Sequence, residues 1–323
     1  MARLTLLDVA KIDATATGEG RIVGLIEENL QYVPELTVFP VDPIEDGGTS
    51  YETLVRTGYP SVSFRSANQG VTPSKSTFAI KLIQCYILSS RIEIDDAVAE
   101  AQKDNGLAME MLEADGVMKQ VLIELASQIW YGVTVDDKGF PGIKAATALG
   151  GATTVNSGGS NATSQSSVYG VKFGKKDVRL VTGGGRVFSL GEFRKESCED
   201  ADGAKFPGRV ADLMGWVGQQ IGSVNSVSRL ANVGDTGETG DMLTDAKLQL
   251  VLDKLPVGYK PDAWFASRRS VGQLQTSRTV TINAGPTQSV TGNVALIADR
   301  PTSSGGIPLY ETDAIGITDA VET

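Results

Sequence analysis

Apolar and polar residues alternate between residues 47 and 90, and this pattern predicts β-structure. Val62 and Phe64 alternate with serines, and a second run follows after the turn-rich segment SANQGVTPSKS. The second run places five apolar residues on one strand face: Phe78, Ile80, Leu82, Tyr86 and Leu88. We expect a long hairpin whose arms of about sixteen residues reach roughly 50 Å. Such a hairpin is marginally stable alone in water, so it requires a further surface in this chain or a neighbour.

Residues 107–131 have the strongest helical pattern. Their apolar residues recur at steps of three and four and predict a helix about 37 Å long. The stripe comprises Leu107, Met111, Ala114, Met118, Val121, Leu125 and Ile129. Asn105 and Gly106 interrupt the pattern before the helix, and Gly132 is a suitable stop after it. We interpret the stripe as a core-packing face rather than a coiled coil.

Weaker patterns flank these two elements. Near the N-terminus, LTLLDVA and IVGLIEENLQYV each predict a short helix, and TVFP predicts a short strand. Residues 145–167 are small and polar, which predicts a surface loop. Residues 168–231 predict several short strands, with a hairpin turn at Gly183–Gly185.

The last third of the chain begins after a predicted boundary loop at residues 232–241. Thr244 is placed to cap a helix, DAKLQLVLDKL, which Pro256 ends. PDAWFAS predicts a buried strand and RRSVGQLQTSR a helix. The remaining residues, rich in Gly, Pro and Ser, predict two short strands.

The composition of the 323 residues, 41% hydrophobic and 21% charged, is that of a globular protein with one large irregular domain or two smaller ones. The net charge of −10 argues against a general nucleic-acid binder, because neutralising phosphate requires Lys and Arg. The charge is also uneven. Residues 1–46 have nine acidic and three basic residues, whereas residues 47–90 have one acidic and four basic residues. The two segments are therefore electrostatically complementary.

The chain contains no His, which excludes Ser-His-Asp and Cys-His nucleophile systems and removes the commonest zinc ligand. Its two cysteines, Cys85 and Cys198, are too few for a disulfide framework or a Cys-rich zinc site. The start, MARLTLLDVAKID, does not have the pattern of a signal peptide, and no apolar run approaches the length of a membrane span. We expect a protein that is made and kept in the cytoplasm unless it leaves inside a particle.

Other candidate chemistry has simpler explanations. The glycines at 183–185 lack the Lys and the Ser or Thr of a P-loop. The acidic pairs lack the spacing of an EF-hand and fit exposed charge at the ends of elements. These pairs are Asp95-Asp96, Asp136-Asp137 and Glu199-Asp200. Arg268-Arg269 fits a solvated or interface charge, and the three tryptophans fit core or interface anchors. We expect no catalytic, metal or cofactor site.

Two long segments resemble the extended loop of a group of phage major capsid proteins. They are GTSYETLVRTGYPSVSFRSANQG and the following VTPSKSTFAIKLIQCYILSSRIEIDDAVAEA. FPGI after the long helix and SRRSVGQLQTSRTVT also resemble this family in their order along the chain. The resemblance extends from about Leu4 to Thr312. It implies an α+β chain with the Hong Kong 97-type capsid fold.

The resemblance also implies a division of the chain. Residues 1–46 would form an N-terminal arm and 47–93 an extended β-hairpin loop. Residues 94–239 would form a peripheral domain with a spine helix at 107–131, and 240–308 an axial domain. Residues 309–323 would then return to the peripheral sheet.

The implied function is a shell subunit, not an enzyme, that forms hexamers and pentamers of an icosahedral virion enclosing double-stranded DNA without sequence-specific binding. Assembly would occur in the host bacterial cytoplasm, with portal and scaffold or decoration proteins as further partners and without a membrane. Seven residues are candidates for contacts between subunits: Arg56, Arg65, Lys75, Lys81, Asp42, Glu45 and Asp46. Two alternatives stay open, a bacterial nanocompartment shell and an enzyme without His that uses paired carboxylates.

Overall fold

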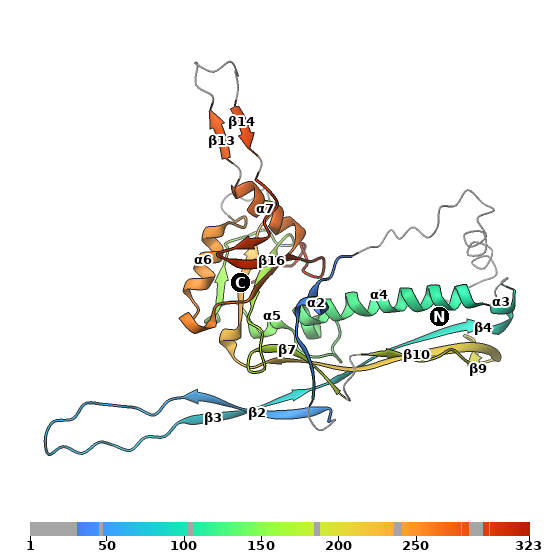
Figure 1. Ribbon diagram of the computed structural model, residues 1–323, viewed down its shortest axis with the longest axis horizontal. Coiled ribbons are helices and arrows are strands. Elements are labelled where there is room, and N and C mark those ends of the chain that lie inside the picture. Colours follow the sequence, from blue (N-terminus) through green and yellow to red (C-terminus); the bar gives the residue numbers. More distant parts are fainter. Residues whose placement is uncertain are drawn as a thin grey trace.

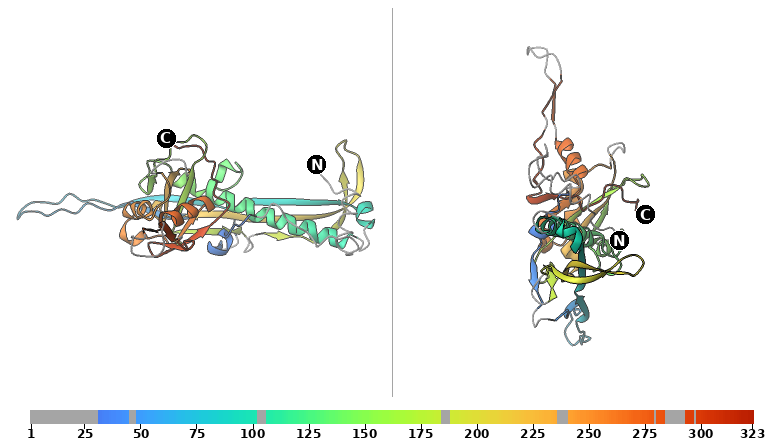
Figure 2. Two further views of the ribbon diagram at one scale, coloured as in Figure 1. Left: turned by 90° about the horizontal axis from the view of Figure 1, so that it is seen from above. Right: turned by 90° about the vertical axis from the view of Figure 1, so that its right-hand side faces the viewer.

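An elongated body carries two β-hairpins that project in different directions (Figure 1). The computed structural model describes residues 31–44, 48–101, 106–183, 188–235, 241–278, 280–283, 293–296 and 298–323. Helix α4 (Leu107–Tyr131) runs along the body beside strands β4 (Tyr86–Asp95) and β10 (Lys205–Ile221), as Figures 1 and 2 show. A lobe with helices α6 (Asp245–Asp253) and α7 (Arg268–Arg278) lies at one end of the body.

The sheet beneath α4 is built on β10, which has seventeen residues where short strands were predicted. β4 pairs antiparallel with one edge of β10, and β7, β8 and β9 pair with its other edge; β1 pairs parallel with β7. The bounds are Val41–Pro43 for β1, Val178–Thr182 for β7, Ser189–Leu190 for β8 and Arg194–Glu199 for β9. The strands that flank Gly183–Gly185, β7 and β8, pair with β10 rather than with each other and so do not form the predicted hairpin, whereas Gly184 and Gly185 lie outside the described residues.

Helix α4 has the predicted bounds and ends at Gly132, whose φ of 58° suits glycine. The C-terminal part of the predicted stripe is buried: Val121, Leu125 and Ile129. In the N-terminal part the core-packing interpretation is wrong, since Leu107 and Met111 are exposed while Met109 packs against β4 and β10. The buried face therefore rotates relative to the stripe along the helix.

The segment TVFP does not form the predicted strand. Residues Glu35–Val38 form one helical turn, α2, after Pro34, whose fixed φ is compatible with a helix start. Phe39 then packs edge-on against Trp130, 5.9 Å between ring centroids. The two helices predicted before α2 lie mostly outside the described residues. The remaining short helices of the described residues are α3 (Asp96–Glu100), α5 (Ile143–Ala146), η2 (Gly132–Thr134), η4 (Val224–Ser226) and η5 (Val257–Tyr259).

The lobe contains a second six-stranded sheet with the order β15-β16-β12-β6-β11-β5. The bounds are Thr154–Asn156 for β5, Ser166–Val171 for β6, Val227–Val233 for β11, Ala263–Ala266 for β12, Ser303–Ser304 for β15 and Ile307–Glu311 for β16. Trp264 faces the apolar side chains of α6 and α7, and Phe265 faces the end of α4 near Trp130. The predicted helices α6 and α7 and the buried strand β12 are confirmed, and Thr244 caps α6.

The pairing in this sheet differs from the division expected from the sequence. β5, β6 and β11, expected with the long helix, pair in the sheet of β12. The expected return of residues 309–323 to the sheet of α4 is wrong for β16, which pairs parallel with β12. Residues 145–167 are not wholly a surface loop, since β5 and the buried Thr153 and Gln165 belong to the lobe. Strand pairing between distant segments is not visible in local patterns.

The predicted hairpin is formed by β2 (Ser50–Gly58) and β3 (Thr77–Gln84), but the paired arms are nine and eight residues long rather than about sixteen. Pro60 and Pro73 lie in the connecting segment 59–76, and proline cannot donate to a β-ladder. A second hairpin, β13 (Val280–Asn283) with β14 (Asn293–Leu296), projects from the lobe and was not predicted (Figure 1).

Candidate assembly surfaces

The hairpin β2–β3 has one apolar face that nothing in the described chain covers. Directly opposed residues of an antiparallel pair share a face, and Leu54 lies opposite Ile80. The exposed apolar side chains on this face are Leu54 at 67%, Phe78 at 52%, Ile80 at 68% and Leu82 at 59%. A contiguous apolar surface of this kind marks an interaction site.

The opposite face of the hairpin packs on the body only at its root. Ile83 is buried in a small cluster with Ile44, Cys85 and Val181, and Tyr51 lies against it. The hydroxyl of Tyr51 bonds to Gln220 of β10. The root is therefore fixed to the long sheet, and the rest of the hairpin extends away from the body (Figures 1 and 2).

Three of the predicted contact residues lie on the projecting part of the hairpin. The Arg56 guanidinium lies over the Phe78 ring at 5.4 Å, and Arg65 Nη1 donates to the Gln69 carbonyl at 3.0 Å. Lys75 is exposed. None of the three forms an ion pair with a carboxylate of the described residues, so their charges are available to a partner.

The other predicted contact residues are occupied within the chain or lie outside the described residues. Lys81 Nζ donates to the Ile221 carbonyl, and desolvation against the body lowers the pKa of Lys81. Asp42 forms a 2.9 Å ion pair with Arg179. Glu45 and Asp46 lie outside the described residues. Among the described candidates, Asp42 therefore does not pair with any of the four basic residues within one chain.

A charged network on the sheet face away from α4 was not predicted. Arg91 and Arg194 contact three carboxylates there: Glu93, Glu196 and Asp212. Hydrogen bonding from Arg194 lowers the pKa of Asp212. The sequence did contain a signal for this network, namely charged residues at alternating positions in RIE (91–93) and RKE (194–196). Alternate residues of a strand share a face, so these charges lie on one side of the sheet.

The C-terminal tail forms a second unpredicted cluster, at the junction between the lobe and α4. Arg229, 2% exposed, donates to both carboxylate oxygens of Glu322 at 2.7 and 2.8 Å. Lys144 lies 3.1 Å from the same carboxylate, and the hydroxyl of Tyr131 donates to Asp319. Pairing of such distant residues leaves no local pattern in the sequence. The cluster fixes the tail to both parts of the body.

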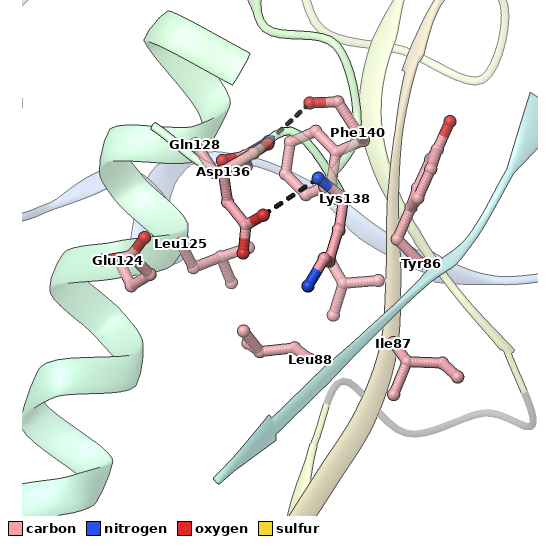
Figure 3. A pocket seen from close by; sticks show the side chains of 11 residues that line it. Tyr86, Ile87, Leu88, Glu124, Leu125, Gln128, Asp136, Lys138 and Phe140 are labelled. Carbon is pink, nitrogen blue, oxygen red and sulfur yellow. Dashed lines mark hydrogen bonds between the residues drawn. The ribbon is translucent and has the colours of Figure 1, made fainter. Parts of the chain in front are cut away.

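A shallow recess lies at the open edge of the long sheet, between α4 and β4 (Figure 3). Leu88, Leu125, Phe140 and Val217 supply apolar walls around a cavity volume of about 60 Å³. Gln128 donates to the Phe140 carbonyl at 2.8 Å. Glu124, Asp136 and Lys138 provide the polar rim: the Asp136 carboxylate accepts from the Lys138 backbone N–H at 2.9 Å.

Within the described part of the chain, no three His, Cys, Asp or Glu side chains gather in a way that would hold a metal ion. No helix among the described residues has the length and hydropathy to cross a membrane. The surfaces that stand out are the hairpin face and the recess.

Residues 20–321 match the model of a family described as major capsid protein GP7. The chain belongs to this family of major capsid proteins. Its function is that of a structural subunit of a tailed-phage shell, as the sequence resemblance implied.

The structure of bacteriophage Epsilon15 is similar to this capsid protein over nearly the whole of both chains. The TM-score is 0.77 at 19% identity, with 100% of this chain and 98% of that chain covered. At this identity the likeness shows the fold, and the expected Hong Kong 97-type capsid fold is confirmed. The capsid of phage JBD30 has a TM-score of 0.47 at 10% identity over 93% of this chain and 98% of that chain. A search of curated proteins by sequence found no match.

Proposed function

We propose that this capsid protein assembles into hexamers and pentamers of an icosahedral shell, with the hairpin β2–β3 overlapping a neighbouring subunit. The observation that carries this proposal is the exposed face of Leu54, Phe78, Ile80 and Leu82. Burying such a side chain against a partner stabilises the contact by about 1.5–3 kcal/mol. A projecting hairpin with an uncovered apolar face is stable in an assembly, where a neighbour supplies the missing surface.

We further propose that the shell encloses double-stranded DNA without sequence-specific contacts, since a net charge of −10 disfavours a tight grip on phosphate. The subunit would act without catalysis, assemble in the host cytoplasm and contact portal and scaffold or decoration proteins. Residues 1–46 would serve as the arm and 47–93 as the extended loop. The lobe that contains β5, β6, β11, β12 and β16 would serve as the axial domain, and the long sheet with α4 as the peripheral domain.

Electron microscopy of the purified protein tests the proposal, with closed shells as the expected result. The double variant Leu54→Asp with Ile80→Asp places two charges on the hairpin face and should abolish shells, because each charge loses solvation when a neighbour covers it. Leu250→Asp on α6 is the matched control, an exposed apolar position on the lobe. Normal shells from the double variant would refute the role of the hairpin face.

Charge reversal tests the basic residues of the hairpin separately. Arg56→Glu with Lys75→Glu should prevent assembly while circular dichroism shows a folded subunit, because both residues are exposed and lack ion pairs with described carboxylates. Lys81→Glu is a less specific test, since Lys81 bonds to Ile221 within the subunit. Unchanged assembly of the double variant would count against electrostatic contacts by these residues.

A further inference from the structure

The C-terminal tail, residues 316–323, lies on the body without entering its core. Ile315 is buried in the main core, but none of the residues after it is buried. The apolar side chains of the tail, Ile317, Ala320 and Val321, belong to none of the apolar clusters of the described residues. The tail can therefore leave the body without exposing apolar core to water.

The surface beneath the tail holds its backbone in an extended form. The backbone groups of Gln165 and Asp319 exchange two hydrogen bonds, both at 3.0 Å, as in an antiparallel strand pair. The Asn232 side chain donates to the Glu322 carbonyl at 2.8 Å and accepts from the Glu322 N–H at 3.0 Å. Asn232 has a left-handed φ of 52°, which asparagine adopts more readily than most residues. The tail is thus bound as a peptide strand is bound by strand addition.

The same surface also contacts two carboxylates of the tail. Arg229 donates to both carboxylate oxygens of Glu322 at 2.7 and 2.8 Å, and Lys144 lies 3.1 Å from Glu322 and 3.6 Å from Asp319. The Tyr131 hydroxyl donates to Asp319 at 2.9 Å. A guanidinium fork matches a carboxylate in shape as well as in charge. The surface therefore distinguishes an acidic segment from a neutral segment of the same length.

We propose that this surface is a peptide-recognition site, the tail site, and that the C-terminal tail is its detachable ligand. The tail site consists of Tyr131, Lys144, Gln165, Arg229 and Asn232. The class of ligand is an extended segment with acidic side chains at its first and fourth positions, as in residues 319–322, DAVE. The tail of a second copy has this pattern and competes with the chain's own tail. The proposal goes beyond the proposed function and does not rest on it, because every contact used lies within one subunit.

Rescue by a separate peptide tests the tail site in the full chain. Glu322→Arg places a positive charge against Arg229 and Lys144, so the tail no longer docks and the melting temperature falls. A synthetic peptide with the sequence of residues 316–323, GITDAVET, should raise the melting temperature of this variant, because a ligand that binds only the folded state stabilises it. The same peptide with both acids replaced by their amides should not. Absence of a rise at millimolar peptide, or an equal rise with the neutral peptide, would overturn the proposal.

Two further variants control this experiment. Ile83→Ala removes a side chain from the buried cluster at the hairpin root and lowers stability, but leaves the tail docked. The acidic peptide should not change its melting temperature, and a rise there would contradict specific binding. Asn232→Ala combined with Glu322→Arg removes the side chain that binds the ligand backbone and should abolish the rescue. Full rescue of this double variant would contradict the role of Asn232.

Hydrogen exchange of the unmodified subunit is a test that does not depend on the folding of a variant. The tail amides should exchange faster than those of β11, and added salt should accelerate exchange in the tail but not in β11. Equal exchange of the tail and β11 at every salt concentration would mean that the tail opens only when the whole subunit unfolds, and the proposal would be wrong. Failure of the protein to form shells would instead refute the proposed function and would leave the tail site unaffected.

Discussion

The hairpin β2–β3 and the lobe sheet are built from similar strand sequences and have opposite burial. Every residue of β6, β11 and β12 is buried, because α6 and α7 cover one face of the sheet and the end of α4 covers the other. In β2 and β3, Ile83 alone is buried. A lone antiparallel pair has too little surface to cover its own apolar side chains. The described part of the lobe sheet is therefore buried within one subunit, whereas the hairpin leaves an apolar face uncovered.

The largest expected loss of stability comes from a substitution in the C-terminal tail, which packs on the lobe. Glu322→Ala leaves the buried Arg229 without its carboxylate partner, and we expect a loss of about 3 kcal/mol in the free energy of unfolding. Urea denaturation of the unassembled subunit measures it. Asp115→Ala removes the exposed pair with Lys119 on α4 and should cost at most about 0.5 kcal/mol. Equal losses of stability in the two variants would contradict the conclusion that the buried pair stabilises the lobe within one subunit.

The same pair predicts a pH dependence. Burial opposes ionisation of Glu322, but hydrogen bonds from Arg229 prevail and hold the pKa of Glu322 below its usual value. The stability contributed by the pair is therefore present above the unfolded-state pKa and is lost as pH falls through the lower folded-state pKa. Unfolding curves of the Glu322→Ala variant should have a weaker acid dependence than those of the unmodified subunit.

Ile83 and Leu82 are adjacent on β3 and lie on opposite faces of the hairpin, so substitutions at these two positions compare the two faces. Ile83→Ala should destabilise the subunit by about 2–3 kcal/mol, because it removes a buried side chain from the root cluster. Leu82→Ala, on the exposed face, should change subunit stability by less than about 0.5 kcal/mol and reduce shell yield. Denaturation and electron microscopy of both variants separate folding from assembly. A folding defect in Leu82→Ala would place that side chain inside the subunit.

A smaller effect is expected where helix α2 packs against the body. Glu35 is fully buried, and its Oε1 accepts hydrogen bonds from Trp130 Nε1 at 2.8 Å and from Thr312 Oγ1. Glu35→Ala leaves both donors without an acceptor and should cost about 1–3 kcal/mol. The measurement is denaturation of the unassembled subunit, and an unchanged midpoint would contradict the structural role of this side chain.

Glu35 also has a pH dependence opposite to that of Glu322. Burial raises the pKa of Glu35, and the hydrogen bonds from Thr312 and Trp130 only partly offset it; nearby Asp313 raises the pKa further. The stability that Glu35 contributes is complete below the unfolded-state pKa and is lost as pH rises through the raised folded-state pKa. Glu35→Gln, which stays neutral, should flatten this part of the stability curve.

The smallest expected effect is on α4, whose N-terminal part resembles the hairpin in exposing apolar residues. Gly116 lies inside the helix, and a Cβ there would meet nothing within 4 Å. Gly116→Ala should therefore stabilise the subunit by about 0.5–1 kcal/mol, since glycine loses more backbone entropy in a helix. Thermal unfolding measures this gain. A loss of stability would contradict the open space around this position in the subunit.

The local spacing of apolar residues was sufficient to predict the elements that pack within a single subunit. The bounds of α4 were predicted because its apolar spacing persists over seven turns, and α6, α7 and β12 have clear caps and breakers. TVFP was assigned wrongly because one helical turn after Pro34 has no period to detect. The recess was not predicted, since its walls come from α4, β4 and the loop at residues 136–140.

The amino-acid sequence by itself determined the long helix, the projecting hairpin, the absence of histidine chemistry and the resemblance to phage capsid proteins. These features depend on neighbouring residues and on composition, and both are present in the linear chain. The tertiary structure decided which strands share a sheet, which side of the hairpin is left uncovered, and how the tail joins Arg229 to Glu322. Such pairings join residues far apart in the chain, so their energies depend on a packing geometry that no local pattern contains.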